Sequence, residues 1–339
     1  MAEFISTFIT GFQDIVAADL PRRLSGIKIL NCYDGLIHYR FDGDSHQLEK
    51  IIYFNNTFFV LKTMKGKGLN FPSLVGALCS SKNYFLVNKG SFRVRFQNEN
   101  QFTKVDKNLA RRAEEYVLAN SKLKLDRLSP TNEVWFCIRR EGFAFCGELI
   151  SKREFTEKNL HKGELRPEIA YLMCCYAQLE KGSVVADPFC GYGSIPVQLA
   201  KRFECTTVFA SDIDEEKIKG LALHPLLQAK GTHGSQAAVD LRQSDAFELS
   251  QIQAVSLDAI ITDPPWGLWE DIPDMQDFYR KMFVSFKRVL KPAGKMIILS
   301  ARAVELEAAA ADCGVSLEKS LHTLVNGKKA VLYYMTYSL

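Results

Sequence analysis

The chain has 339 residues, of which 47% are hydrophobic and 24% are charged, and its formal net charge at pH 7 is +4. This composition is typical of a globular protein. It excludes an intrinsically disordered chain, which combines low hydrophobicity with high net charge. The length predicts two or three domains, each with a core of its own. The longest apolar stretches, such as residues 51–54, are too short to span a bilayer.

Nine cysteines are scattered along the chain without a Cys-x-x-Cys pair. The odd number and the irregular spacing argue against a disulfide framework and against a structural zinc site. The first residues lack the basic leader of a signal peptide. We therefore expect reduced thiols, no bound metal and a cytoplasmic location.

Positive charge is concentrated in one middle segment of the chain. Residues 61–150 carry 16 basic and 8 acidic side chains, whereas residues 1–60 and 151–339 each have a net charge of −2. Such a surplus is typical of a surface that binds a polyanion such as a nucleic acid. The alternative is a solvated basic face without a partner.

Up to about residue 150, short strands rich in β-branched and aromatic residues alternate with amphipathic helices, which is typical of α+β folds. Helices are expected over residues 11–20 and 106–119, the second with Asp106 as its N-cap. The expected strands are residues 4–10, 37–41, 92–96, 134–139 and 143–150. The run Lys65-Gly66-Lys67-Gly68 interrupts this pattern, so we expect two small modules that divide near residues 60–70.

From about residue 165 the pattern becomes strand, turn and helix, repeated. The expected strands are 183–187, 206–212, 259–262 and 295–300, and the helices that follow them are 194–202, 215–230, 274–290 and 301–313. This alternation predicts an α/β fold, a doubly wound parallel sheet with helices on both faces. The last two segments, 315–324 and 330–337, flank Asn326-Gly327, a strong hairpin signal, so the sheet should end in an antiparallel pair.

A doubly wound sheet binds its ligand at the carboxyl ends of its strands. Gly191 and Gly193 follow the first of these strands and let the backbone approach a ligand closely. A dinucleotide fingerprint requires a third glycine where this chain has Pro196. The motif therefore indicates a cofactor without a pyrophosphate, or else only a tight turn from strand to helix.

Acidic residues follow the next two strands. Asp212 lies about 20 residues after the glycines, a spacing that suits the hydroxyls of a ribose, and Ile213 offers an apolar face to an adenine ring. Asp245 follows the probable third strand and offers an acceptor for an adenine amino group. We therefore expect a cofactor that contains adenosine.

The segment Asp263-Pro264-Pro265-Trp266-Gly267 follows the fourth strand. The two prolines stiffen the loop and hold the Pro264 carbonyl in place. A carboxylate, a carbonyl and an aromatic plane suit a flat base with an exocyclic amine, because the oxygens accept its two N–H bonds while the indole stacks on the ring. We expect the chemistry here; the alternative is a proline-rich turn. Trp269 is a second candidate for the base pocket, with packing as the alternative.

Residues 165–339 resemble class I S-adenosylmethionine-dependent methyltransferases. The motifs DPFCGYGS at 187–194 and DPPWG at 263–267, downstream of a basic α+β region, resemble the THUMP-domain RNA methyltransferases, in particular the tRNA guanosine N2-methyltransferase group. Upstream, the run at 92–96 and Leu128-Ser129-Pro130 resemble the THUMP pattern more loosely. The resemblance implies a ferredoxin-like module at 1–62 and a THUMP RNA-binding domain at 63–152. A linker with a cofactor-closing helix at 153–180 and the methyltransferase domain at 181–339 follow.

The resemblance also implies roles for individual residues. Asp263 and Pro264 would hold the target amine and Trp266 the base. The residues that it assigns to S-adenosyl-L-methionine are Arg166, Pro167, Asp187, Phe189, Gly191, Gly193, Ser194, Asp212, Ile213, Asp245, Ala246 and Asp263. Two departures from the family pattern are Tyr192 and Ser194, where a small residue and Thr are frequent. Trp266 stands where Tyr or Phe is common in the guanine-specific group, and DPPW also occurs in N6-adenine methyltransferases, so the target base stays open.

The family's THUMP module holds tRNA, mainly through its phosphates. The basic candidates for this contact are Arg93, Arg95, Lys104, Lys107, Arg111, Arg112, Arg139 and Arg140, and an ordinary surface charge is the alternative for each. We expect a monomer that methylates guanosine N2 in tRNA, without a membrane contact; the need for a small activating protein partner stays open. The other candidates are an amino-methyltransferase for rRNA or DNA adenine and a catalytically silent RNA-binding subunit.

Overall fold

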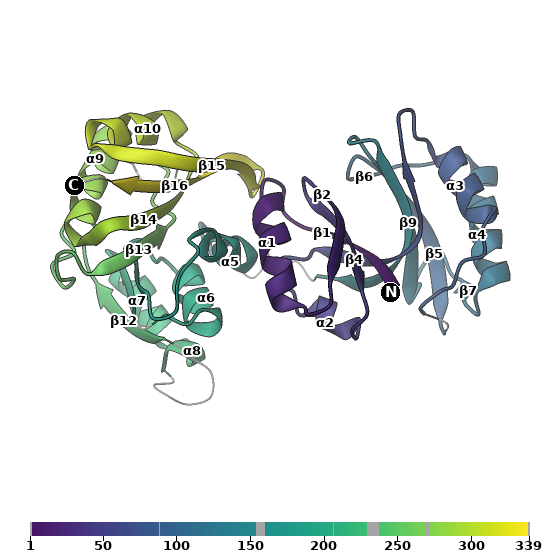
Figure 1. Ribbon diagram of the computed structural model, residues 1–339, viewed down its shortest axis with the longest axis horizontal. Coiled ribbons are helices and arrows are strands. Elements are labelled where there is room, and N and C mark those ends of the chain that lie inside the picture. Colours follow the sequence, from purple (N-terminus) through teal and green to yellow (C-terminus); the bar gives the residue numbers. More distant parts are fainter. Residues whose placement is uncertain are drawn as a thin grey trace. The chain divides into compact units, whose positions relative to one another are not determined.

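The computed structural model describes residues 2–87, 89–153, 160–205, 207–228, 237–268 and 271–337. The chain forms two compact units (Figure 1). The first comprises Met1–Phe8 and Ala17–Glu154, and the second comprises Ile9–Val16 and Phe155–Leu339. Within the described residues, no helix combines the length and apolar character needed to cross a membrane.

The first unit is built on a nine-stranded sheet with the order β2-β3-β1-β4-β9-β8-β5-β6, and β7 pairs with β5. Its strands are β1 Ala2–Thr7, β2 Lys28–Tyr33, β3 Leu36–Phe41, β4 Asn56–Lys65, β5 Ser91–Asn98, β6 Gln101–Phe102, β7 Lys124–Leu125, β8 Asn132–Arg139 and β9 Phe143–Lys152. Because β4 pairs with β1 on one side and β9 on the other, one sheet runs through the division expected at 62/63.

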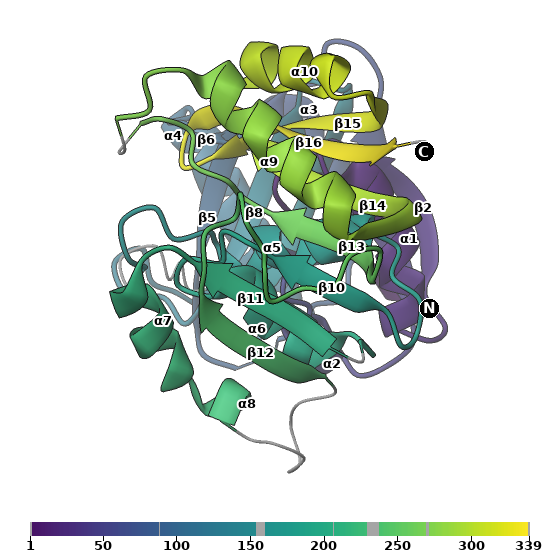
Figure 2. The ribbon, with the colours of Figure 1, turned by 90° about the vertical axis from the view of Figure 1, so that its left-hand side faces the viewer.

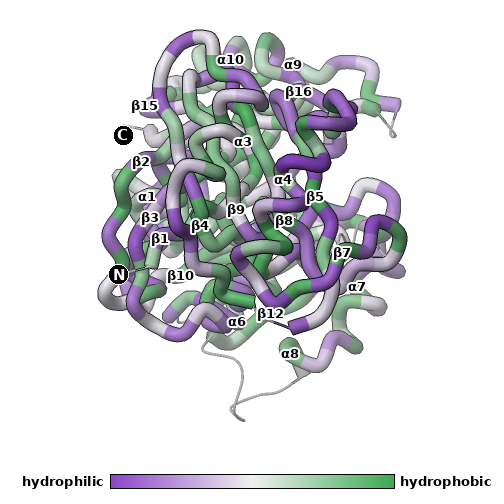
Figure 3. Tube along the Cα trace, turned by 90° about the vertical axis from the view of Figure 1, so that its right-hand side faces the viewer, coloured by the Kyte–Doolittle hydropathy of each residue, from purple (hydrophilic) through white to green (hydrophobic). Residues whose placement is uncertain are grey.

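The helices of this part of the chain are α1 Gln13–Arg23, α2 His46–Glu49, α3 Phe71–Cys79 and α4 Lys107–Asn120. Asp106 caps α4 as expected, since its side chain accepts hydrogen bonds from the backbone N–H groups of Asn108 and Leu109. Hydrophilic and hydrophobic residues alternate along β5 and around α4 (Figure 3). Ala113 and Val117 of α4 are buried, which leaves the basic residues of that helix on its exposed side.

The second unit contains a seven-stranded sheet with the order β12-β11-β10-β13-β14-β16-β15. Its strands are β10 Val184–Asp187, β11 Thr207–Asp212, β12 Ala238–Gln243, β13 Leu257–Thr262, β14 Leu290–Ser300, β15 Val315–Val325 and β16 Lys328–Tyr337. The first five pair in parallel, whereas β16 is antiparallel to both β14 and β15. Asn326 and Gly327 make the hairpin turn with φ angles of 50° and 80°. The expected doubly wound sheet with an antiparallel end is confirmed.

Helices cover both faces of this sheet. They are α5 Pro167–Tyr176, α6 Ser194–Arg202, α7 Glu215–Ala222, α8 Pro225–Gln228, α9 Met275–Val289 and α10 Ala303–Asp312. α9 and α10 cover one face and α5 and α6 the other (Figure 2). The side of α9 and α10 forms a large core with Ile260, Tyr279, Phe283, Phe286 and Ile298 fully buried. Burial of each such side chain contributes about 2 kcal/mol.

One expected helix is wrong in its extent. Residues 215–230 were expected as a single helix, but α7 ends at Ala222 and α8 begins at Pro225. Proline lacks the N–H that would continue the helical hydrogen bonds, and its ring clashes with the preceding turn. Residues 229 and 230 lie outside the described residues.

Candidate active site

The strand order reverses between β10 and β13, which are neighbours in the sheet although the strands β11 and β12 lie between them in sequence. Ligands bind at such a reversal because the loops on either side turn to opposite faces and open a crevice. The residues that follow β10 and β13 therefore border this crevice. The first of these segments contains the two glycines, and the second contains the DPPWG motif.

The conformation of the loop after β10, which we call the glycine loop, depends on its two glycines. Gly191 and Gly193 have φ angles of +52° and +90°, which side chains disfavour. A Cβ at Gly193 would lie 2.2 Å from a methyl carbon of Leu221, so no other residue fits there without rearrangement. Around Gly191, in contrast, a Cβ would meet nothing within 4 Å. The first glycine thus leaves open space at the carboxyl edge of the sheet.

Asp212, the last residue of β11, ties this loop to the neighbouring strand. Its Oδ2 accepts the backbone N–H of Gly191 at 2.9 Å, and its Oδ1 accepts that of Asp214 at 3.0 Å. The Nζ of Lys217 lies 3.9 Å from Oδ1. The side chain is nearly buried, at 8% exposure. The sequence predicted a ribose ligand at this position, and the structure adds that Asp212 also shapes the glycine loop.

The other residues predicted to contact an adenosine follow β11 and β12, which are parallel neighbours. Ile213 is 70% exposed, which is unusual for so apolar a side chain. Asp245 accepts the backbone N–H of Phe247 at 2.8 Å and keeps its loop in a tight turn, and Ala246 is buried beneath it. The fold thus brings Asp212, Ile213 and Asp245 to one edge of the sheet.

Asp187 ends β10 and is almost completely buried. The hydroxyl of Thr262, from the adjacent strand β13, donates a hydrogen bond of 2.7 Å to its Oδ1. Burial raises the pKa of Asp187 to about 7, against the effect of the Thr262 hydrogen bond, and the negative charge of Asp212 adds to the increase. Thr262 was not predicted from the sequence, although it is a polar residue that follows the apolar run Ala259-Ile260-Ile261 of this strand.

Asp263 follows β13 directly and begins the segment 263–267, which we call the proline loop. The indole Nε1–H of Trp266 donates to its Oδ1 at 2.9 Å. Burial raises the pKa of Asp263 to about 8; the indole hydrogen bond opposes this increase and the charge of Asp187 adds to it. Pro264 is buried. The loop therefore contains two hydrogen-bond acceptor groups on adjacent residues, the Asp263 carboxyl and the Pro264 carbonyl.

Three further side chains fix this loop, and none was predicted from the sequence. The hydroxyl of Tyr279, from α9, donates to the Pro265 carbonyl at 3.4 Å and shares a hydrogen bond of 2.9 Å with Ser300. The Nε of Arg302 donates to the Trp266 carbonyl at 2.8 Å. Ser300 ends β14 and Arg302 lies two residues later, so their position at the carboxyl end of a parallel strand was an available signal.

The segment before α5 contacts the glycine loop. The hydroxyl of Ser194 donates to the Leu165 carbonyl at 2.6 Å. Arg166 precedes Pro167 at the start of α5, and its Nε donates to the buried Glu168 at 2.6 Å. Ser194 is thus a link between the two segments predicted to enclose the cofactor, and Arg166 is engaged by Glu168.

The remaining predicted residues near this site have mixed surroundings. Phe189 is half-buried, and its ring lies 5.8 Å from that of Phe278. Tyr192, one of the departures from the family pattern, stacks on His161 with ring centroids 4.1 Å apart. Trp269 lies outside the described residues. No group of His, Cys, Asp and Glu side chains that could hold a metal ion occurs in the described part of the chain.

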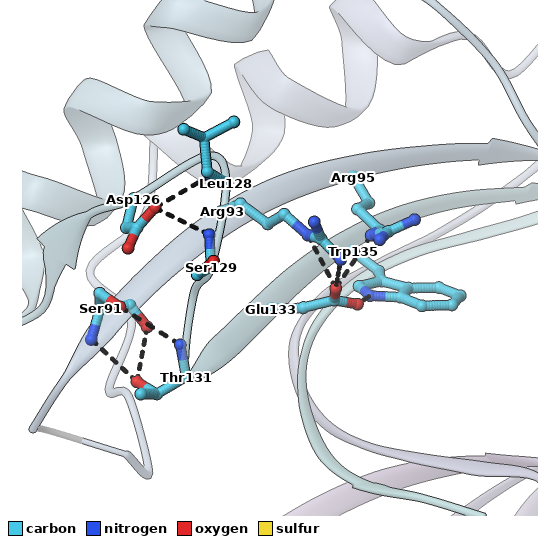
Figure 4. Close-up of polar contacts among 9 residues, drawn as sticks. All are labelled: Ser91, Arg93, Arg95, Asp126, Leu128, Ser129, Thr131, Glu133 and Trp135. Atoms are coloured by element: carbon cyan, nitrogen blue, oxygen red, sulfur yellow. Dashed lines mark hydrogen bonds and ion pairs between the residues drawn. The ribbon is translucent and has the colours of Figure 1, made fainter. Parts of the chain in front are cut away.

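The eight predicted RNA-binding residues fall into two groups. Three have strong partners within their own unit: Glu133 lies between Arg93 and Arg95 (Figure 4), with its Oε1 2.8 Å and 3.0 Å from their Nε atoms. Arg139 is buried and donates to Asn100 and to the Asp34 carbonyl. The five that are exposed are Lys104, Lys107, Arg111, Arg112 and Arg140.

Glu133 is a strong partner because it is itself well held. Trp135 donates its indole N–H to the other carboxylate oxygen, Oε2, at 2.7 Å (Figure 4). Burial raises the pKa of Glu133, but the hydrogen bonds from Arg93 and Trp135 outweigh it and leave the pKa below its ordinary value. Glu133 is therefore ionised at neutral pH and neutralises part of the positive charge of Arg93 and Arg95.

The raised pKa values of Asp187 and Asp263 predict a pH-dependent stability. The usual pKa of an aspartate side chain is 3.8, whereas that of Asp187 is about 7 and that of Asp263 about 8 in the folded chain. Between pH 4 and 8 the unfolded chain therefore binds fewer protons than the folded chain, so the free energy of unfolding falls as the pH rises.

Asp263→Asn mimics the protonated acid and should therefore reduce this decrease in the free energy of unfolding. We expect it to stabilise the second unit by about 1–2 kcal/mol at pH 8 and by much less at pH 5. Thermal unfolding of parent and variant at the two pH values measures the difference. An equal effect at both values would contradict the proposed burial of charge.

Comparison with known proteins places the second unit in a family. The model of the UPF0020 family, described as RMKL-like, methyltransferase domain, matches residues 153–330, more than half of the chain. The chain belongs to this family. Its members' shared domain covers the glycine loop, the acidic residues after β11 and β12, and the proline loop described above.

Curated relatives are similar over parts of the chain. The U6 snRNA (guanine-N(2))-methyltransferase THUMPD2 of Bos taurus is 30% identical over 139 residues, which cover 40% of this chain and 25% of that protein. The tRNA (guanine(6)-N2)-methyltransferase of Thermus thermophilus is 28% identical over 225 residues, 65% of each chain. This UPF0020 chain thus matches about a quarter of the length of THUMPD2 and about two thirds of the Thermus enzyme.

Solved structures show that the fold extends to both units. The crystal structure of TrmN from Thermus thermophilus has a TM-score of 0.77 and 20% identity, and the match covers 99% of this chain and 100% of that one. The crystal structure of SMU.472 in complex with SAH has a TM-score of 0.69 and 11% identity, and the match covers 100% of this chain and 98% of that one. At these identities the likeness concerns the fold.

Proposed function

We propose that this UPF0020 protein transfers a methyl group from S-adenosyl-L-methionine to the exocyclic amine of a base in structured RNA, with N2 of guanosine in tRNA as the target. The observation that carries the proposal is the proline loop at the strand reversal, where the Asp263 carboxyl and the Pro264 carbonyl follow β13 beside Asp187. The names of the relatives, which act on guanine N2 of tRNA or U6 snRNA, support the choice of base and of RNA.

The residues present fit the proposed cofactor. Ile213 exposes an apolar side chain that an adenine ring would cover, and Asp212 and Asp245 supply acceptors for ribose hydroxyls and for the adenine amine. The open space at Gly191 lets a ligand lie against the backbone. When bound, S-adenosylmethionine supplies an electrophilic methyl group on a positively charged sulfur.

The proline loop would prepare the amine for this methyl group. An aromatic amine is a weak nucleophile because its lone pair is delocalised into the ring. If the carboxylate of Asp263 and the carbonyl of Pro264 accept its two N–H bonds, the nitrogen is held in place and its lone pair is more available. After transfer, the nitrogen must lose a proton. Asp263, with a pKa of about 8, is suited to accept it near neutral pH.

A second candidate function is methylation of adenine N6, because Trp266 completes a DPPW sequence and adenine also carries an exocyclic amine. Incubation with labelled cofactor and either tRNA, an rRNA fragment or duplex DNA separates the possibilities. Mass spectrometry of the nucleosides should detect N2-methylguanosine from tRNA. N6-methyladenosine would favour the second candidate, and no labelled nucleoside at all would favour a catalytically silent RNA-binding subunit.

We propose that residues 63–152 form a THUMP RNA-binding domain, with a ferredoxin-like module at 1–62, a linker with a cofactor-closing helix at 153–180 and the methyltransferase domain at 181–339. The exposed basic residues Lys104, Lys107, Arg111, Arg112 and Arg140 would bind RNA phosphates. Arg93, Arg95 and Arg139 would instead stabilise the domain, because these side chains are buried or half-buried and have internal partners. Arg111 and Arg140 also have acidic neighbours, Glu115 and Glu141, but both arginines are exposed.

The RNA surface can be tested on α4. The triple change Lys107→Gln, Arg111→Gln and Arg112→Gln should raise the Kd for tRNA about 10-fold at 0.1 M salt and reduce the salt dependence of binding, because fewer counterions are released. At saturating RNA, kcat should stay within about 2-fold of the parent. A matched control, Arg22→Gln with Lys28→Gln and Lys50→Gln, removes three exposed charges of the same unit outside the basic segment. Equal effects of the two variants would contradict a localised surface.

We also propose that the protein acts as a monomer in the cytoplasm. Within the described residues none of the cysteines forms a disulfide, which suits a reducing compartment. Size-exclusion chromatography with light scattering tests the monomer, and activity of the purified chain alone tests whether a small activating protein partner is needed.

A further inference from the structure

We propose that Trp266 is a positioning residue whose indole N–H orients the Asp263 carboxyl, so that one carboxyl oxygen is held by the indole and the other is left for the target amine. This rests on the proposed function and goes beyond it, since the family resemblance assigns Trp266 only to the base. A phenylalanine ring at this position could stack on a base, but it has no N–H to donate.

The indole is anchored at two acceptors. Its Nε1 lies 2.9 Å from Asp263 Oδ1 and 3.4 Å from the carbonyl oxygen of Leu299. Leu299 is fully buried in β14, next to β13 in the sheet. The N–H is thus shared between the loop and the sheet, and the ring cannot rotate away without losing both contacts.

The backbone on either side of the indole is also held. Arg302 Nε donates to the carbonyl of Trp266 itself, and the Tyr279 hydroxyl donates to the carbonyl of Pro265. Gly267 then reverses the chain with a φ of +63°, where a Cβ would lie 3.0 Å from the sulfur of Met275. These contacts fix the position of the indole before any base arrives.

This arrangement determines which form of the carboxyl is favoured. Within the described residues, Trp266 supplies the hydrogen bond that the Asp263 side chain accepts. A carboxylate that accepts from the indole is stabilised in its ionised form, and only the ionised form offers two oxygens that carry no proton, one for the indole and one for the amine. A protonated carboxyl would present its own O–H and compete with the amine N–H. The indole therefore opposes the effect of burial and increases the ionised fraction of Asp263, the form that can accept from the amine.

The change Trp266→Phe retains an aromatic ring and removes the N–H. We expect kcat at pH 7 to fall about 10-fold. The increase of kcat with pH, which follows the ionisation of Asp263, should shift upward by about one pH unit, so that kcat is partly restored at pH 9.5. The KM for RNA should change less than about 3-fold, because the ring still stacks. Trp135→Phe is a matched control: it removes an indole N–H from Glu133 in the other unit and should leave kcat and its pH limb unchanged.

A loss of kcat in Trp266→Phe that is equal at all pH values, or no loss, overturns the proposal. An increase in KM alone would assign Trp266 to base stacking and likewise overturn it. If the parent methylates no RNA, the proposed function fails, but the positioning role is still decided by a measurement that needs no substrate.

That measurement follows the indole N–H signals of the parent by NMR from pH 6 to 9.5. The signal of Trp266 should shift as Asp263 ionises, and this shift should be lost in Asp263→Asn, which also assigns the signal. The signal of Trp135 should stay constant over this range, because Glu133 is already ionised. An unchanging Trp266 signal in the parent would show that the indole does not sense the carboxyl and would overturn the proposal.

Discussion

Asp263→Asn is expected to lower kcat for methyl transfer about 100- to 1000-fold, the range found when one preorganised hydrogen-bonding group of a catalytic site is removed. The side chain keeps its shape but has one carbonyl oxygen instead of two. If that oxygen accepts from Trp266, the amide NH2 points toward the target amine, and two hydrogen-bond donors then face each other. If the oxygen accepts from the amine, the NH2 opposes the indole N–H, which lies 2.9 Å from the present oxygen.

Single-turnover assays with saturating RNA and cofactor measure this loss directly. Asp263→Ala should show a loss of similar size, since it removes both acceptors. Because Asp263→Asn is expected to stabilise the fold at pH 8, its loss of activity cannot be attributed to unfolding. Methyl transfer within a few-fold of the parent in both variants would mean that the proline loop is not the catalytic loop.

Asp212→Ala is expected to raise the Kd for the demethylated cofactor product about 30- to 100-fold. The change removes the proposed acceptor of the ribose hydroxyls and, in the same step, the acceptors of the Gly191 and Asp214 N–H groups. A hydrogen bond to a charged group contributes about 1.5–3 kcal/mol, and the loosened glycine loop adds to the loss. Isothermal titration calorimetry with the product measures it.

The matched control is Asp214→Ala, two residues away. Its side chain caps α7 by accepting from Glu216 and Lys217, while its backbone N–H still donates to Asp212. This control should cost about 1 kcal/mol of stability and leave the affinity within about 3-fold. If the two variants bind equally well, Asp212 shapes the loop without holding the cofactor.

Most of the second unit could be predicted because its signals are local. The alternation of strands and helices, the glycines with positive φ after β10 and the Asn326-Gly327 turn all depend on residues close together in sequence. Parallel strands bring their carboxyl ends to one edge, so Asp187, Asp212 and Asp263 could be expected near one another before any contact was known. In the first unit the N-cap Asp106 is a signal of the same kind.

Contacts between distant residues were not predictable in this way. Arg93 and Arg95 were predicted from the sequence as RNA-binding candidates, but Glu133, about 40 positions later, holds both of them (Figure 4). The parallel pairing of β5 with β8 places Arg93 opposite Glu133, and nothing in either strand alone indicates that register. The charge surplus of a segment therefore overstated the number of its free cations.

The class of this fold and the order of the motifs along the edge of its sheet were predictable from the amino-acid sequence, because both follow from periodicity and from backbone preferences within a few residues. The hydrogen-bond partners became known from the folded chain: Thr262 for Asp187, Trp266 for Asp263, and Tyr279 and Arg302 for the proline loop. The direction of a side chain and the protonation of a carboxyl depend on which atoms surround it, and elements far apart in the sequence supply most of those atoms.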